Sequence, residues 1–129
     1  MPKFKFEKLV RDKIVEHQVK SGARPKYRIM SGEAHKQQLI EKLIEEAREI
    51  LAAPPEELAG EIADVQQVLD DLKDLLKVKN ETVSEAQARK NQKNGAFKEG
   101  IYIESVEVDE HDQWVAYYRK NADRYPEIK

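Results

Sequence analysis

Carboxylate side chains recur at a spacing of three residues on both sides of Pro55. The sequence reads Glu46-x-x-Glu49 before this proline and Glu61-x-x-Asp64 after it. Residues three apart on a helix share a face, so each segment would present a pair of carboxylates. Glu49 and Glu61 are equally distant from Pro55 in sequence, and so are Glu46 and Asp64. If two antiparallel helices meet near this proline, we expect the two pairs to lie opposite each other.

Four converging carboxylates need cations or protons, because two like charges about 4 Å apart repel by about 4 kcal/mol at an effective dielectric constant of 20. The chain has no cysteine, and none of its three histidines stands three residues after a glutamate. Oxygen ligands alone favour a hard cation, Mg²⁺ or Mn²⁺ as its substitute, and phosphate-ester or anhydride hydrolysis as the chemistry. One such pair in a chain that is 37% charged is usually a solvated face. The mirrored second pair favours a metal site.

Helical periodicity predicts the elements that must position these acids. Ser31 is the expected N-cap of the helix that carries Glu46, and a clean apolar seam from Leu58 to Leu76 marks the helix that carries Glu61. Two short segments read as strands that would pair with each other, residues 26–30 and 101–104. We therefore expect an all-α helix bundle with a small two-stranded β element. The expected helices cover residues 9–19, 32–52, 55–76, 83–93 and 110–121.

Composition limits the class of protein. With 129 residues and a formal net charge of -2, the chain fits one domain, residues 1–129, without the positive field that holds a nucleic acid polymer. The absence of cysteine excludes disulfides, and no apolar stretch is long enough for a membrane span. The charged N-terminal residues do not resemble a secretory signal, so we expect a cytoplasmic protein with neither a membrane nor a nucleic acid polymer as its partner.

Two further groups of residues are candidates for binding or packing. A triphosphate needs cations beyond its metal, and a basic stretch around Gly95 could supply them, although the same residues could simply complement a helix C-terminus. Arg11 is a weaker candidate, because such residues are often exposed ion pairs. Aromatic residues 114, 117 and 118 share one helical face, which favours packing over base stacking. The candidate phosphate-binding residues are Arg11, Arg89, Lys90, Lys93 and Lys98.

The acidic pattern, read with Glu45 in front of it, resembles the signature of the MazG-like all-α nucleotide pyrophosphohydrolases, a superfamily that includes dimeric dUTPases and phosphoribosyl-ATP pyrophosphohydrolase. Segments 8–14 and 90–97 are similar to the ends of a small branch thought to clear non-canonical nucleotides. The resemblance covers about residues 8–103 and leaves 104–129 unmatched. It implies that four acids hold Mg²⁺ and that Glu45 and Glu46 are catalytic residues. Glu45 would be either an additional metal ligand or the base that orients water. The four implied ligands are Glu46, Glu49, Glu61 and Asp64.

The same resemblance implies hydrolysis of nucleoside triphosphates to monophosphate and pyrophosphate. Phosphoribosyl-ATP hydrolysis in histidine synthesis is the alternative substrate assignment, since the same acids would serve it. A non-catalytic helical interaction module is the alternative of a different class, in which the acids are a solvated strip. We also expect a homodimer, because the Leu58 to Leu76 seam is long for a small domain and a second subunit would bury the surplus.

Overall fold

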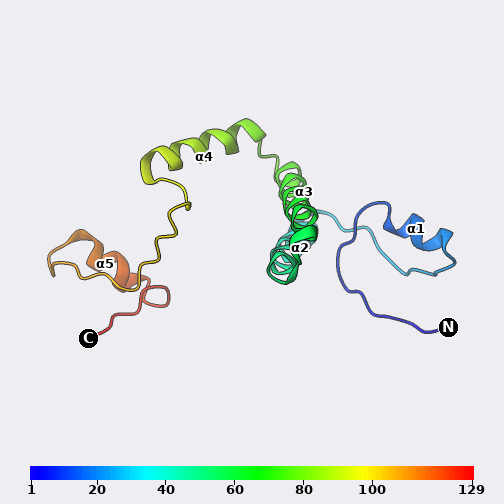
Figure 1. Cartoon of the computed structure of the whole chain (residues 1–129), viewed down its shortest axis with the longest axis horizontal. Coiled ribbons are helices and arrows are strands. Elements are labelled where there is room, and N and C mark those ends of the chain that lie inside the picture. The colour runs from blue at the N-terminus through cyan, green and yellow to red at the C-terminus, as the bar shows by residue number, and fades with distance from the viewer. The chain divides into compact units, whose positions relative to one another are not determined.

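The computed structural model describes all residues, 1–129, and every regular element in it is a helix (Figure 1). The chain divides into two compact units, residues 1–89 and 90–129, with the division inside α4. The all-α prediction is therefore confirmed, and the assignment of residues 1–129 to one domain stays a prediction. The elements are α1 (Ile14–Lys20), α2 (Gly32–Ala52), the 3₁₀ turn η1 (Pro55–Glu57), α3 (Leu58–Leu76), α4 (Asn80–Asn94) and α5 (Gln113–Lys120).

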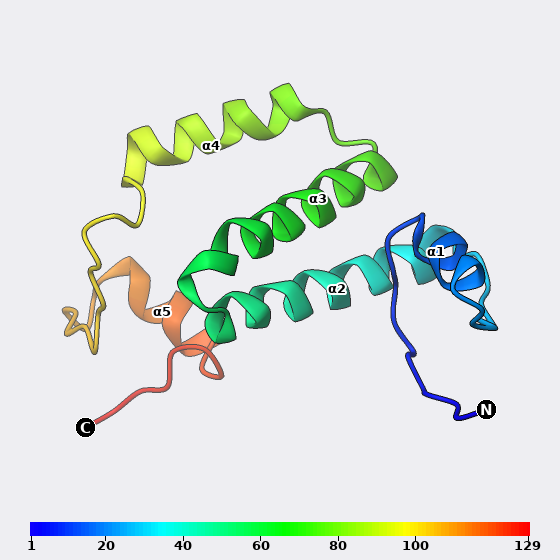
Figure 2. The same cartoon turned by 45° about the vertical axis from the view of Figure 1, so that its right-hand side comes forward.

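Helices α2 and α3 form an antiparallel hairpin closed by η1 (Figure 2). Helix α2 has the predicted bounds, and Ser31 occupies its N-cap position in an extended conformation without a side-chain cap bond. Helix α2 ends at Ala52, and the two residues that follow, Ala53 and Pro54, are both extended. Each of them precedes a proline, which disfavours helical geometry in the residue before it. Pro55 then suits the first position of the tight turn that leads into α3. The short connection forces the two helices to pack side by side.

The hairpin buries few of its apolar side chains. Leu39 on α2 is the one buried hydrophobic residue, with 4% of its surface exposed. Ile44 on α2 and Ile62 and Leu69 on α3 are all exposed, although they belong to the apolar stripes of their helices. Leu51, near the end of α2, is 91% exposed. The contact of α2 with α3 is therefore narrow, and the homodimer predicted from the seam stays a prediction.

The predicted strand pair is wrong, because residues 26–30 and 101–104 contain no strand. Both segments expose their large apolar side chains, namely Tyr27, Ile29, Ile101 and Ile103. Neither segment therefore buries an apolar face that would stabilise strand pairing. A two-stranded ribbon is marginal in water by itself, and these two segments belong to different units. Neither segment therefore forms a β ladder.

Several helix ends differ from the predicted bounds. Helix α1 begins later than the predicted residue 9, at Ile14, and ends at Lys20, one residue beyond the predicted end. Gly22 follows with φ 91°, and the Ala23 amide donates to the Gln18 carbonyl at 2.9 Å, a glycine-terminated helix end that a positive φ permits. Helix α4 begins at Asn80, before the predicted residue 83, and ends at Asn94, one residue beyond the predicted end.

Helix α3 ends on a lysine in a backbone conformation that suits glycine. Lys77 has φ 57°, and the Val78 amide donates to the Lys73 carbonyl at 2.9 Å across it. A side chain in this left-handed region costs about 1–2 kcal/mol. We expect Lys77→Gly to raise the free energy of unfolding by up to about 1 kcal/mol, since the greater entropy of unfolded glycine offsets part of the gain.

Urea denaturation of the purified variant would measure this effect. Gln66→Gly, an exposed position inside α3, is the matched control and should lower the free energy of unfolding by roughly 0.5–1 kcal/mol. Opposite signs for the two glycine variants are the expected result. A loss of stability in Lys77→Gly would contradict the assignment of strain to this helix end.

The second unit contains α5 and its surrounding chain. The Asp112 carboxylate caps α5 by accepting a hydrogen bond from the Trp114 amide at 2.8 Å. The rings of Trp114 and Tyr117 lie edge to face with centroids 5.5 Å apart, and Tyr118 lies 5.1 Å from Tyr125. These rings pack against one another, and Tyr125 joins them from beyond the helix. The packing of this face against the rest of the domain or a second subunit, which the sequence favours over base stacking, stays a prediction.

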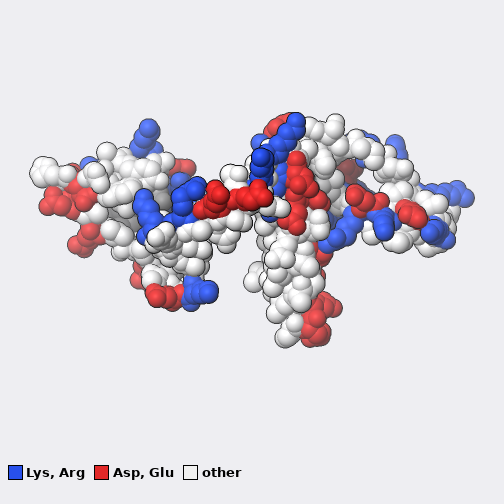
Figure 3. Space-filling model, turned by 90° about the horizontal axis from the view of Figure 1, so that it is seen from above, with Lys and Arg blue, Asp and Glu red and all other residues white.

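The surface carries both signs of charge. On the face that Figure 3 shows, Lys and Arg side chains lie interspersed with Asp and Glu, without a broad area of one sign. None of the helices has the length and apolar character needed to cross a membrane. The mixed surface agrees with the near-zero net charge of the sequence.

Candidate metal centre

The α2–α3 hairpin brings three of the predicted acids together. Glu46 from α2 and Glu61 and Asp64 from α3 each offer one carboxylate oxygen, and these oxygens all lie within 4.8 Å of one another. Glu61 and Asp64 share a face of α3 because they are three residues apart. The turn at η1 returns the chain so that this face meets Glu46. We call these residues the carboxylate triad.

The triad is partly shielded from solvent. The Glu46 side chain is 12% exposed, and Glu61 and Asp64 are half-buried. Burial raises the pKa of Glu61 above its ordinary value, and the neighbouring charges of Glu46, Glu49 and Asp64 raise it further. The part of this rise that comes from the three neighbouring carboxylates reflects like charges close to Glu61. A bound cation would relieve their repulsion.

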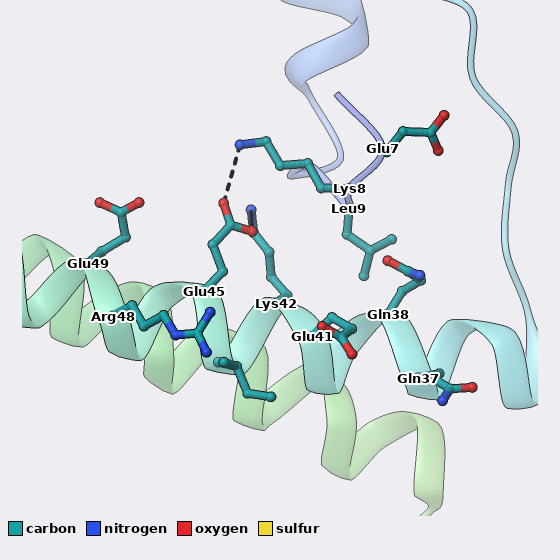
Figure 4. Close-up of a pocket in the computed structure, with 11 residues that line it drawn as sticks. Glu7, Lys8, Leu9, Gln37, Gln38, Glu41, Lys42, Glu45, Arg48 and Glu49 are labelled. Atoms are coloured by element: carbon teal, nitrogen blue, oxygen red, sulfur yellow. Dashed lines mark hydrogen bonds and ion pairs between the residues drawn. The ribbon is translucent and has the colours of Figure 1, made fainter. Parts of the chain in front are cut away.

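Two other predicted acids lie beside the triad. Glu49 is exposed and is not among the three converging oxygens, yet its charge acts on Glu61. Glu45 is not among the three converging oxygens and lines a cleft, where Lys8 and Lys42 donate hydrogen bonds to it at 3.3 and 3.2 Å (Figure 4). Burial alone would raise the pKa of Glu45, but these two lysines hold it below its ordinary value. The roles predicted for Glu45 and Glu49 stay predictions.

The donor chemistry of the triad fits a hard divalent cation. All three donors are carboxylate oxygens, and neither cysteine nor histidine contributes to the group. Magnesium binds oxygen at about 2.0–2.1 Å, so two of its ligands are at most about 4.2 Å apart. The oxygens of the triad are separated by 4.8 Å or less, a distance that small side-chain rotations would close. Glu46, Glu61 and Asp64 could therefore hold Mg²⁺ or Mn²⁺.

Three basic residues contact the acids of this region. Arg11 donates to Asp64 at 2.5 Å, and Lys42 lies 3.5 Å from Glu46 as well as contacting Glu45. Lys8 reaches Glu45 from the N-terminal segment. Sequence reasoning singled out Arg11 but missed both lysines. Lys42 precedes Glu46 by four residues, a helical spacing that could have revealed the pair, whereas no local signal places Lys8 beside Glu45.

The other predicted phosphate-binding residues lie at and beyond the division between the units. Arg89 ends the first unit, and the remaining three belong to the second. All four are exposed, so their side chains are accessible to an anion. Their part in phosphate binding stays a prediction. These residues are Arg89, Lys90, Lys93 and Lys98.

Comparisons with known proteins do not assign a function to this chain, so a functional assignment depends on the chemistry of the site. The sequence resemblance to MazG-like enzymes remains an expectation, as do the activity and substrates that it implies. No protein-family model, curated protein or solved structure matches this chain.

Proposed function

We propose that the protein is a Mg²⁺-dependent nucleoside triphosphate pyrophosphohydrolase, which releases a nucleoside monophosphate and pyrophosphate. The observation that carries the proposal is the convergence of Glu46, Glu61 and Asp64 from two helices within 4.8 Å. An accidental group of surface acids gains nothing from such an approach, because like charges repel. Burial beside two apolar stripes increases that cost, which a divalent cation would offset.

Each residue of the triad has a role in this proposal. Glu46, Glu61 and Asp64 would hold the metal, which would supply charge neutralisation for the polyphosphate and a lowered pKa for water. The oxygen of water bonds to the α-phosphorus and gives up a proton to solvent, while the bond between the α-phosphorus and the bridging oxygen breaks and that oxygen leaves with pyrophosphate. A side-chain nucleophile is unnecessary for this displacement. Positioning and charge neutralisation therefore account for the work asked of the protein.

Glu45 is poorly suited to accept the proton of the attacking water. Its hydrogen bonds from Lys8 and Lys42 lower its pKa and occupy its carboxylate oxygens. A general base works best when its pKa lies near the working pH. Glu49 is exposed and close enough to act electrostatically on Glu61, so it is the better candidate to orient water. This assignment gives Glu49 the water-orienting role that the resemblance implies for Glu45.

The non-catalytic module has one observation in its favour. Arg11 pairs with Asp64 and Lys42 pairs with Glu46, so side chains of the protein already neutralise part of the triad. In such a module these ion pairs would be structural, and the acids would bind no metal. The two functions therefore differ in metal binding and in turnover.

A pyrophosphate-release assay over a nucleotide panel separates these functions. The panel contains canonical and non-canonical nucleoside triphosphates and phosphoribosyl-ATP, each with Mg²⁺, with Mn²⁺ and with EDTA. We expect release of pyrophosphate from at least one triphosphate with either metal and its loss in EDTA. Release from phosphoribosyl-ATP alone would reassign the substrate, and release from no compound would favour the non-catalytic module.

A further inference from the structure

The N-terminal segment of residues 7–11 contacts the hairpin through two cations. Lys8 reaches Glu45 at 3.3 Å across 37 positions of sequence, and Arg11 reaches Asp64 across 53 positions. Lys42 adds a third cation from α2, and its side chain is only 19% exposed. These three residues, which we call the basic group, approach acids of the triad or their immediate neighbour. They belong to the first unit together with the triad.

A cleft opens between this segment and α2. It is an open groove with a volume of about 630 Å³. Its lining includes Lys8, Leu9 and Lys42, with Arg48 and Glu49 toward one end. Figure 4 shows Lys8 and Glu45 directed toward one another across it. Because Lys42 lines the cleft and also lies 3.5 Å from Glu46, the cleft adjoins the triad.

We propose that Lys8, Arg11 and Lys42 bind the polyphosphate of the substrate, which enters through this cleft. The inference rests on the proposed function and names the anion-binding residues of the same site. A triphosphate carries more negative charge than one divalent cation neutralises, so further cations must face it. Lys8 and Lys42 line the cleft, where an anion can reach them. Arg11 lies outside the lining of the cleft but is exposed and pairs with Asp64 of the triad.

The cations of the basic group now pair with carboxylates, and binding a polyphosphate requires them to exchange these partners for phosphate oxygens. When a divalent cation neutralises Asp64, Arg11 loses the charge that now holds it and can turn toward phosphate oxygens. Lys42 loses one of its two acidic partners, Glu46, and keeps the other, Glu45. The Arg11 and Lys8 side chains are exposed by 58% and 47%, and exposed ion pairs contribute little stability. Arginine suits this role because its planar donors match a phosphate group in pairs.

Isothermal titration calorimetry can separate metal binding from anion binding without turnover. Mn²⁺ is first titrated into the full-length protein, and inorganic pyrophosphate is then titrated into the Mn²⁺-loaded protein. We expect Arg11→Gln to bind Mn²⁺ at least as tightly as wild type, because Asp64 no longer has a competing cation. Its affinity for pyrophosphate should fall at least about tenfold, the loss of a charged hydrogen bond. Lys8→Gln should show the same separation.

Matched controls remove the same charge elsewhere. Arg24→Gln and Lys5→Gln alter exposed residues of the same unit and should leave both affinities at the wild-type value. Circular dichroism establishes that each variant is folded before titration. Wild-type pyrophosphate affinity in both Arg11→Gln and Lys8→Gln would overturn this inference alone, and so would loss of Mn²⁺ binding in both folded variants. Failure of the wild-type protein to bind Mn²⁺ would overturn the proposed function and this inference with it.

Discussion

Glu61→Gln is expected to reduce metal-dependent pyrophosphate release at least about 100-fold, because even the outer partners of metal ligands contribute 10–100-fold to affinity or activity. The substitution keeps the size of the side chain and removes the charge. It also leaves Glu46 and Asp64 in place, so the loss would report the contribution of one of the three converging oxygens. Turnover with saturating Mg²⁺ and titration of Mn²⁺ measure the two consequences separately.

The same variant should be more stable than wild type when no metal is present. The pKa of Glu61 is raised, so its contribution to stability is fully present below its unfolded pKa and is lost as the pH rises through the folded pKa. Glutamine does not ionise, so Glu61→Gln avoids that loss, and its melting temperature at neutral pH in EDTA should exceed that of wild type. Added Mg²⁺ should raise the melting temperature of wild type but not that of Glu61→Gln.

Glu56→Gln is the control for both measurements, since Glu56 is an exposed acid on η1 outside the triad. It should turn over substrate and melt as wild type does. Equal activity of Glu61→Gln and Glu56→Gln would contradict the ligand assignment. A melting temperature of Glu61→Gln below that of wild type in EDTA would contradict the charge-repulsion argument.

Leu39→Ala should have the largest effect on stability, lowering the free energy of unfolding by about 2–4 kcal/mol. Leu39 is the one buried hydrophobic residue, so its truncation removes apolar contact where the hairpin has no other fully buried side chain to compensate. A small domain has only about 5–15 kcal/mol in total, so this loss is large. Thermal and urea unfolding followed by circular dichroism would measure it.

Leu51→Ala is the matched control on the same helix, because Leu51 is 91% exposed. Its effect should stay within about 0.5 kcal/mol. Similar losses in the two alanine variants would show that helix propensity, and not burial at Leu39, determines the stability of the hairpin. The comparison also tests whether the apolar stripe near Leu51 is covered in solution, since coverage by another copy would increase the cost of Leu51→Ala.

The helices could be predicted where local chemistry decides them. The 32–52 segment combines a cap residue, an apolar stripe and a following proline pair, and α2 has those bounds. The strand prediction for residues 26–30 and 101–104 failed because alternation alone does not supply a face to bury. Pairing between distant segments depends on tertiary context, which a local pattern does not contain.

The candidate site shows the same division between local and distant information. The mirrored spacing about Pro55 anticipated the approach of Glu46 to Glu61 and Asp64, because a helix hairpin converts sequence distance into position. The contact of Lys8 with Glu45 joins residues 37 positions apart through an irregular segment. Such a contact depends on how the whole unit packs, so no local sequence pattern predicts it.

The positions of the cations along the chain affect the order of folding events. Lys42 lies on the same helix as Glu46, so this pair forms as soon as α2 winds, on the submicrosecond scale of helix formation. Arg11 meets Asp64 only after a loop of 53 positions has closed, an event with a higher entropic cost. If the hairpin closes before this contact forms, the acids come together while they are only partly compensated, and electrostatic repulsion opposes that closure.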